Sequence, residues 1–154
     1  MGVIGGMVRF VVYGEPVSKE RPRTVSTYDR SGRRSVHTYT PKSTKEWEQE
    51  IAWAYKSLYK GHCFHKPSVL RMVIDAYLSI PGSKSKKMKE KMKAGEVRPI
   101  GKRDVDNIAK AVADAGNGLI YDDDTQIVEM TVRKFYSDEP RVEIYISEIG
   151  ESDE

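Results

Sequence analysis

Between residues 69 and 80, apolar side chains occupy every second position, and this alternation is the strongest constraint on the fold of the chain. The alternating residues are Leu70, Met72, Ile74, Ala76, Leu78 and Ile80. Side chains two positions apart share one face of a β-strand, so this period predicts a strand with one buried face. Such a strand requires hydrogen-bonded neighbours, and the chain must therefore form a sheet.

Three further segments alternate in the same way and are predicted to be strands. They span residues 7–14, 126–136 and 141–147. The short sequence SDEP lies between the last two, which predicts that they pair as an antiparallel hairpin. A short strand at residues 35–39 is expected to return from a turn at Ser31-Gly32.

Two segments carry apolar residues at helical spacing. The first, residues 43–60, opens with the capping-box pattern Ser43-x-x-Glu46, and the second runs from about Asp104 to Ala115. Strands and helices within 154 residues predict an α/β (α+β) fold. We expect a single compact domain in which helices pack on a mixed sheet.

The remaining segments are expected to be less ordered. Residues 1–6 and 149–154 are predicted to be frayed ends of the domain. Residues 82–103 are rich in lysine and carry only a thin apolar stripe. They are predicted to be a mobile basic segment or a loosely docked helix.

Charge is distributed unevenly along the chain. The first 103 residues hold 22 Lys and Arg against 9 Asp and Glu, a net of +13, whereas the last 51 hold 4 against 14, a net of −10. This asymmetry fits a protein that grips a polyanion and places carboxylates against it. It fits equally well two solvated faces that attract each other within the fold.

The sequence offers no sign of export or membrane insertion. Cys63 is the single cysteine, so no internal disulfide can form, which suits a reducing compartment. No stretch approaches the roughly 18 apolar residues needed to span a bilayer, and no signal peptide is present. We expect a cytoplasmic protein without a membrane partner.

Two acidic clusters are the candidate chemical groups. Asp104 and Asp106 stand at the start of the second helix, and residues 122–124 are three consecutive aspartates. Helix capping and favourable interaction with the helix dipole explain the first cluster without any catalysis. If the connection from the helix folds back, however, four carboxylates converge, and a divalent cation such as Mg²⁺ would relieve their repulsion.

Other familiar sites do not fit the sequence. EF-hand loops beginning at Asp104 or Asp122 lack the required glycine and final acid. Three histidines and one cysteine do not show zinc-site spacing, although His62-Cys63-Phe64-His65 is suggestive. Neither a phosphate-binding P-loop nor a G-x-S-x-G elbow is present.

Several motifs together resemble the RusA family of Holliday junction resolvases, in its phage or prophage form. They are RDVDNIAKAVADAGNG, GLIYDDDTQIV and RKFY, preceded by VYGEPVSKERPR and by YTP before a Trp-bearing helix. The resemblance covers nearly all of residues 7–148. Two departures are Gly116, where many relatives carry Leu, and Asp122, which adds a third consecutive acid.

The resemblance implies an endodeoxyribonuclease that acts in DNA recombination and repair. It implies a homodimer that cuts four-way branched DNA by paired symmetric incisions with Mg²⁺, or with Mn²⁺ in its place, and with no small-molecule cofactor. The implied metal-binding acids are Asp104, Asp106 and Asp124, with Asp123 beside them, and Lys110 completes the catalytic group. Whether Asp122, Asp123 or both support Asp124 stays open.

Basic and amide side chains are the candidate DNA contacts. They are Lys19, Arg21, Arg23, Arg33, Arg34, Lys102, Arg103 and Asn107. Two other functions remain compatible with the sequence. One is a branched-DNA-binding protein without catalysis, and the other is a Mg²⁺-dependent hydrolase of small phosphorylated substrates.

Overall fold

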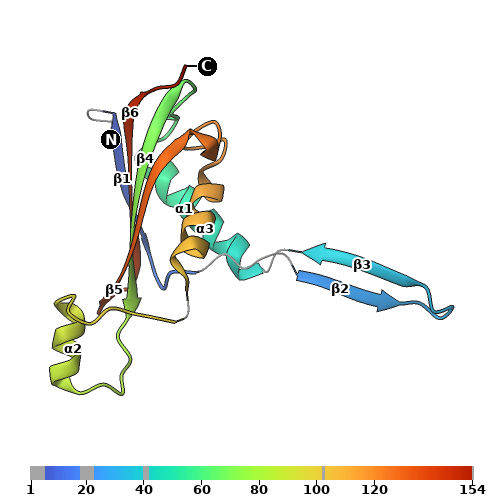
Figure 1. Ribbon diagram of the computed structural model, residues 1–154, viewed down its shortest axis with the longest axis horizontal. Coiled ribbons are helices and arrows are strands. Elements are labelled where there is room, and N and C mark those ends of the chain that lie inside the picture. Colours follow the sequence, from blue (N-terminus) through green and yellow to red (C-terminus); the bar gives the residue numbers. More distant parts are fainter. Residues whose placement is uncertain (1–5, 18–22, 40–41, 102, 154) are drawn as a thin grey trace.

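The computed structural model describes residues 6–17, 23–39, 42–101 and 103–153. Its elements, in chain order, are β1 (Met7–Tyr13), β2 (Arg23–Tyr28), β3 (Arg34–Tyr39), α1 (Lys42–Leu58), β4 (Ser68–Ser79), α2 (Lys86–Lys93), α3 (Val105–Gly116), the short 3₁₀ helix η1 (Asp124–Gln126), β5 (Ile127–Ser137) and β6 (Arg141–Glu151). Figure 1 shows a compact body and a separate two-stranded ribbon that projects from it. Among the described residues, no helix has both the length and the apolar character needed to cross a membrane.

The body is built on a four-stranded sheet with the order β1-β6-β4-β5. β6 is antiparallel to both of its neighbours, whereas β4 and β5 are parallel. The sheet is therefore mixed, and the predicted α+β class is confirmed. A parallel pair needs a long crossover connection, and here α2 and α3 lie in the chain between β4 and β5.

The predicted hairpin between the last two strands is wrong. β4 lies between β5 and β6, so these two strands do not pair in the described sheet. The buried side chains of Val142, Ile144 and Ile146 place β6 in the interior of the sheet, whereas Val128 and Met130 on β5 are exposed at its edge. The short link from β5 to β6 therefore passes the end of β4, across two strand spacings of about 4.8 Å each.

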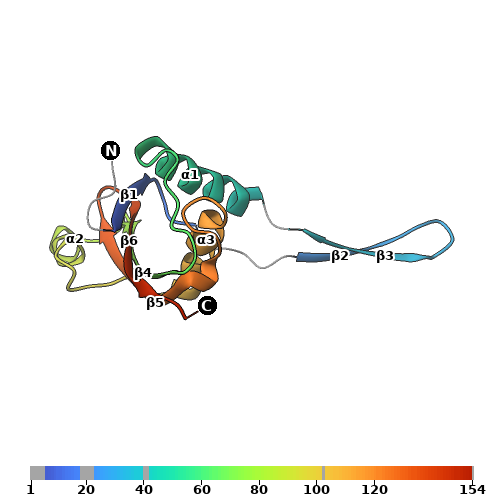
Figure 2. The same ribbon diagram turned by 90° about the horizontal axis from the view of Figure 1, so that it is seen from above.

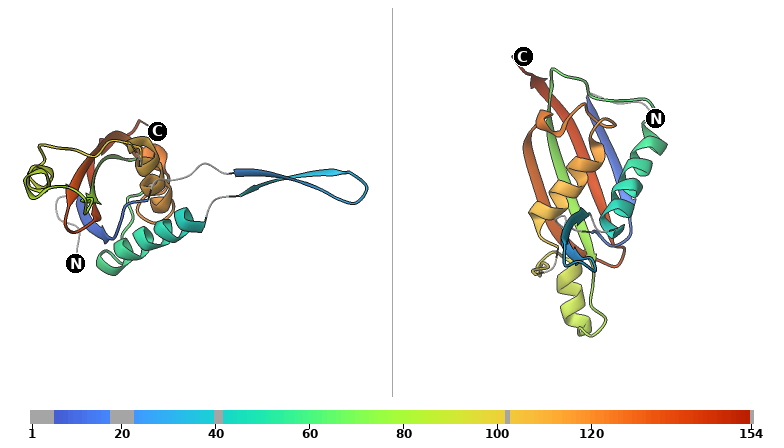
Figure 3. Two further views of the ribbon diagram at one scale, coloured as in Figure 1. Left: turned by 90° about the horizontal axis from the view of Figure 1, so that it is seen from below. Right: turned by 90° about the vertical axis from the view of Figure 1, so that its right-hand side faces the viewer.

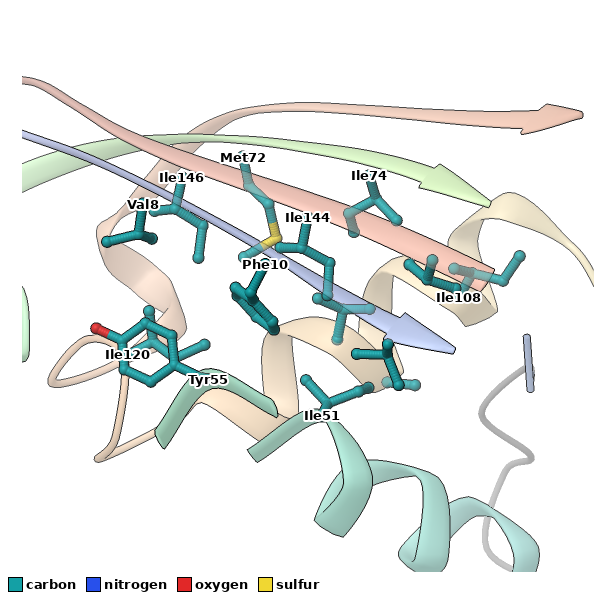
Figure 4. Close-up of a cluster of buried hydrophobic side chains, with 14 of the residues drawn as sticks. Val8, Phe10, Ile51, Tyr55, Met72, Ile74, Ile108, Ile120, Ile144 and Ile146 are labelled. Carbon is teal, nitrogen blue, oxygen red and sulfur yellow. The ribbon is translucent and has the colours of Figure 1, made fainter. Parts of the chain in front are cut away.

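The hydrophobic core lies on one face of the sheet, beneath α1 and α3 (Figure 2). Figure 4 shows Phe10 and Ile144 from the strands meeting Tyr55 from α1 and Ile108 from α3. Phe10 and Tyr55 pack edge to face, with ring centroids 5.5 Å apart. The alternating residues that predicted β4 are all buried on this face, apart from Ile80, which follows the strand.

The boundaries of three segments differ from those expected. α1 begins at Lys42, so Ser43 lies in its first turn instead of capping it. β6 continues to Glu151, which places part of the expected frayed end in the sheet. The basic segment 82–103 contains the ordered helix α2, which packs near β5 and buries Met92.

Gly116 ends α3 because the ring of Tyr121 lies directly against it. A Cβ atom built at this glycine would stand 2.5 Å from the Tyr121 hydroxyl oxygen and 2.6 Å from Cζ. The ring is fully buried, and its hydroxyl donates a hydrogen bond to the carbonyl of Ala113 at 2.5 Å. A larger residue at position 116 would not fit, so glycine here is a packing requirement of this chain.

We predict that Gly116→Ala destabilises the protein by about 1–3 kcal/mol, the range usual for overpacking a core. The better helix propensity of alanine, about 1 kcal/mol, offsets only part of this loss. Urea denaturation measures the difference in unfolding free energy. Gly82→Ala is the matched control, because nothing lies within 4 Å of the added Cβ there. Equal stability of the two variants would contradict the packing role of Gly116.

Candidate metal and nucleic-acid site

The first acidic cluster lies at the amino-terminal end of α3. Asp104 occupies the N-cap position with extended backbone angles, φ −63° and ψ 144°, but its side chain makes no capping hydrogen bond. Asp106 follows in the first turn, and both side chains are exposed. Neither carboxylate forms an ion pair within the described part of the chain, so both are available to a cation or a ligand.

Lys110 and Asn107 lie on the same helix as the first cluster. The Lys110 ammonium is 3.8 Å from a carboxylate oxygen of Asp114, one turn further along α3, and its side chain is 66% exposed. Asn107 is half-buried. Asp106 and Asp114 each lie four residues from Lys110, one helical turn away on either side, and the structure pairs Lys110 with Asp114.

The three aspartates of the second cluster have three different sets of partners. The Asp122 carboxylate accepts hydrogen bonds from the backbone N–H of Lys66 at 2.8 Å and lies 2.9 Å from Nδ1 of His65. The hydrogen bond from Lys66 is the main cause that lowers the pKa of Asp122, followed by that from His65. Asp122 is therefore turned toward the loop that precedes β4.

Asp123 and Asp124 are held by polar side chains close to them in the sequence. The Thr125 hydroxyl donates to Asp123 at 2.6 Å, and this hydrogen bond lowers the pKa of the Asp123 carboxyl. Asp124 is bound by Asn117, whose side-chain oxygen accepts from the Asp124 N–H at 2.8 Å. The Asn117 amide nitrogen also lies 3.4 Å from the Asp124 carboxylate. Each of the two aspartates is thus held by a different polar side chain.

The two clusters lie at opposite ends of α3 within one chain. Asp104 caps the start of this 12-residue helix, and Asn117, which holds Asp124, caps its end. A helix rises by 1.5 Å per residue, so about 18 Å separates the two ends. Figure 3 shows α3 running from the ribbon end of the body toward the turn before β5. The connection does not fold back, and four carboxylates do not converge in one copy of the chain.

The candidate DNA contacts fall into two groups. Lys19, Arg21 and Lys102 lie outside the described residues, and of Arg23 only the backbone is described. Arg103 has a left-handed backbone conformation, with φ 68°, and its guanidinium donates to the carbonyl oxygen of Pro16. This bond joins the residue just before the N-cap of α3 to the segment that follows β1 and leads toward the ribbon.

The tip of the ribbon carries two of the predicted contacts. Asp29 accepts hydrogen bonds from the Ser31 hydroxyl at 2.6 Å and from the Arg33 N–H at 2.9 Å. These bonds lower the pKa of the Asp29 carboxyl and keep it ionised while it shapes the turn. Arg34 donates to the Ser26 hydroxyl across the two strands at 3.0 Å. The tip is therefore a shaped turn that presents arginines to solvent.

Two amide residues of the site were missed in the sequence. In the sequence, Asn117-Gly118 indicates only a turn at the end of a helix, because Asn-Gly is a common turn signal. Gln126 is buried, and its amide nitrogen donates to the carbonyl oxygens of Phe64 and Ser68, both at 3.1 Å. Its own oxygen accepts from the Asp123 N–H at 3.0 Å. These bonds fix η1, and with it Asp123 and Asp124, to the loop before β4.

Comparisons with known proteins agree with this architecture. A family model described as endodeoxyribonuclease RusA matches residues 13–147. The chain is also similar to the "Uncharacterized protein YqaN" of Bacillus subtilis (strain 168), with 42% identity over 150 residues that cover 93% of this chain and 97% of that protein. The chain thus belongs to a class of endodeoxyribonucleases, hydrolases of the DNA backbone. More particularly, the chain is a member of the RusA family, whose nucleases act on branched DNA and generally depend on a divalent metal.

We predict that Gln126→Met destabilises the protein by about 2–6 kcal/mol. Methionine fills a similar volume but leaves two buried carbonyl oxygens without a donor, at about 1–3 kcal/mol each. Denaturation in urea measures the loss. Gln49→Met, at an exposed position on α1, is the control and should change stability by less than about 0.5 kcal/mol. If Gln126→Met left the free energy of unfolding unchanged, these two bonds would make no net contribution to stability.

Proposed function

We propose that this protein is a divalent-metal-dependent endonuclease that resolves four-way DNA junctions by two symmetric incisions. The observation that carries the proposal is the exposed carboxylate pair of Asp104 and Asp106 at the start of α3. The Arg103 to Pro16 bond brings the approach to the ribbon to this same end of the body. In this proposal the metal-binding carboxylates and the basic ribbon act together on one DNA substrate.

The donor set fits a hard cation such as Mg²⁺, with Mn²⁺ as a possible substitute. Carboxylate oxygens are the protein ligands that Mg²⁺ prefers, and Asp104 and Asp106 carry no competing cation within the described chain. When bound, the metal would activate a water molecule and neutralise charge on the scissile phosphate. Asp124 is the third ligand of the proposal, and Asp123 supports the turn on which Asp124 lies.

The metal site of the proposal is completed between two copies of the chain. Because Asp124 is held at the end of α3 opposite to Asp104 and Asp106, and the helix is about 18 Å long, one copy does not supply all three ligands. A two-fold axis that sets two α3 helices antiparallel would bring the partner's Asp124 to Asp104 and Asp106. The same axis generates a second, identical site, and two sites match the two strands that must be cut.

Lys110 has a catalytic role in this proposal. It lies one helical turn after Asp106, and its ammonium is two-thirds exposed with only a 3.8 Å contact to Asp114. A mobile cation there can stabilise the negative charge that grows on the phosphate during attack. The DNA-binding residues Arg33, Arg34, Arg103 and Asn107, together with Lys19, Arg21, Arg23 and Lys102, position the substrate.

The test of the function is a cleavage assay on an end-labelled four-way junction, beside a linear duplex of the same sequence. We expect paired symmetric nicks in the junction that require Mg²⁺ and are lost in Asp104→Asn. Junction binding without any cut, in Mg²⁺ or Mn²⁺, would support a binding protein instead. Equal cutting of duplex and junction would support a nuclease that has no preference for junctions.

Mixing two inactive variants tests whether the site is shared between copies. Asp104→Asn and Asp124→Asn should each be inactive alone. If the site is shared, each mixed dimer regains one intact site, so the mixture should recover about a quarter of the wild-type sites when subunits exchange freely. The restored activity should appear as single nicks in gel assays. No recovery, with exchange confirmed by differently tagged copies, would mean that each site belongs to one chain.

Lys110→Ala should reduce cleavage by about 100-fold or more while junction affinity changes by less than about threefold. Single-turnover cleavage and gel-shift titration measure the two quantities separately. Lys56→Ala, an exposed lysine near the end of α1, is the control. Parallel loss of binding and cleavage would assign Lys110 to substrate binding instead of catalysis.

A further inference from the structure

Three chemically different metal-ligating side chains meet outside the proposed magnesium site. Ligand atoms of Cys63, His65 and Asp122 all lie within 4.8 Å of one another. Cys63 and His65 belong to the loop before β4, whereas Asp122 is 57 residues beyond His65. Asp122 is the aspartate of its cluster that turns away from Asp124, and the nuclease proposal leaves all three side chains without a role.

The backbone of Phe64 brings the two loop residues to the same side. Phe64 forms a short parallel bridge with Tyr121, and its N–H donates to the carbonyl of Ile120 at 2.8 Å. The Phe64 side chain is buried in the core, only 4% exposed. In extended backbone, successive side chains point in opposite directions, so Cys63 and His65 on either side of Phe64 point together toward the surface.

A hydrogen bond from the backbone of Lys66 orients Asp122 toward Cys63 and His65. One of its carboxylate oxygens accepts from the backbone N–H of Lys66 at 2.8 Å, and the other faces His65. Such an outer hydrogen bond is typical of carboxylates that ligate metals. The segment around Asp122 is further attached to the same loop through Gln126.

An ion pair alone is a weak explanation of this arrangement. The side chains of His65 and Asp122 are 72% and 39% exposed, and an ion pair at such a position contributes little to stability. An ion pair between His65 and Asp122 also leaves Cys63, which is half-buried beside them, without a role. A ligand that uses sulfur, nitrogen and oxygen together accounts for all three side chains.

We propose that Cys63, His65 and Asp122 bind one Zn²⁺ ion per chain, with water in the fourth position. Thiolate and imidazole ligands favour zinc, whereas Mg²⁺ prefers an all-oxygen set, so this site is distinct from the one at α3. Zinc–ligand bonds of about 2.0–2.3 Å place tetrahedral ligands about 3.3–3.8 Å apart. Pairs of these ligand atoms, at present within 4.8 Å of one another, therefore need to approach by about 1.5 Å at most. Binding converts the thiol to a thiolate and releases its proton to solvent.

The ion would join two segments that are far apart in the sequence. It links the loop before β4 to the residue that directly precedes Asp123 and Asp124. The site thus acts as a structural clip for the turn that carries these carboxylates, and needs no part in the cleavage reaction.

Metal binding to the full chain tests the proposal, with Co²⁺ as the spectroscopic probe and Zn²⁺ as its competitor. We expect one Co²⁺ per chain with a thiolate-to-cobalt charge-transfer band, and displacement by Zn²⁺. Cys63→Ser should abolish the band. Each of Cys63→Ser, His65→Ala and Asp122→Asn should raise the zinc dissociation constant by at least about 100-fold. Circular dichroism of the metal-free variants checks that they are folded.

Two neighbouring residues provide matched controls. His62 lies beside Cys63 but is bonded to the hydroxyl of Tyr55 at 2.9 Å, and Asp123 lies beside Asp122 but is bonded to Thr125. His62→Ala and Asp123→Asn should leave zinc affinity within about threefold of the wild-type value. No charge-transfer band in the wild-type protein would overturn the proposal. So would unchanged zinc affinity in any of the three ligand variants, or equal loss in the controls.

Discussion

The contact between Tyr121 and Gly116 determines how the chain passes from α3 to the acidic residues. The buried ring occupies the space that a side chain at 116 would take, and its hydroxyl bonds to the carbonyl of Ala113. Burial is the main cause that raises the pKa of this phenol, and the nearby charges of Asp124 and Asp114 add to it. Tyr121 is therefore neutral at physiological pH, as its hydrogen bond to the carbonyl of Ala113 requires. The bridge from Tyr121 to Phe64 extends the same constraint to the loop before β4.

Most of the secondary structure could be predicted from the sequence, but not the neighbours of each strand. Alternation in β4 and β6 identifies which face is buried, because side-chain direction is a local property. It does not say which strand lies beside which, and the short link between β5 and β6 suggested a pairing that β4 prevents. The order of the sheet depends on packing between segments distant in the sequence.

The candidate site was predictable to the same extent. Asp104 and Asp106 could be placed at a helix start because capping patterns are local. The roles of Asn117 and Gln126 could not be found, since each depends on partners that only the folded chain brings near. The same holds for the grouping of Asp122 with the loop around His65. The distance between the two acidic clusters likewise follows from the length and direction of α3.

The two interpretations of the uneven charge concern different parts of the molecule. Arg9, from the basic portion, pairs at 3.1 Å with Glu143 from the acidic portion, and Lys93 pairs with Asp138 at 2.8 Å. These contacts neutralise part of the asymmetry inside the body. The ribbon lies apart from the acidic strands (Figure 1). Arg30, Arg33 and Arg34 near its tip are exposed.

The ribbon also sets how far the protein can reach. Each of its strands has six residues, which at about 3.4 Å per residue gives a length of roughly 20 Å. The major groove of DNA is about 12 Å wide and admits a two-stranded ribbon. A two-stranded hairpin is marginally stable by itself, so DNA that lies along it would add the contacts that a third strand otherwise provides. Under the proposed function, bound DNA would in this way stabilise the ribbon, which the hydrophobic core of the body does not.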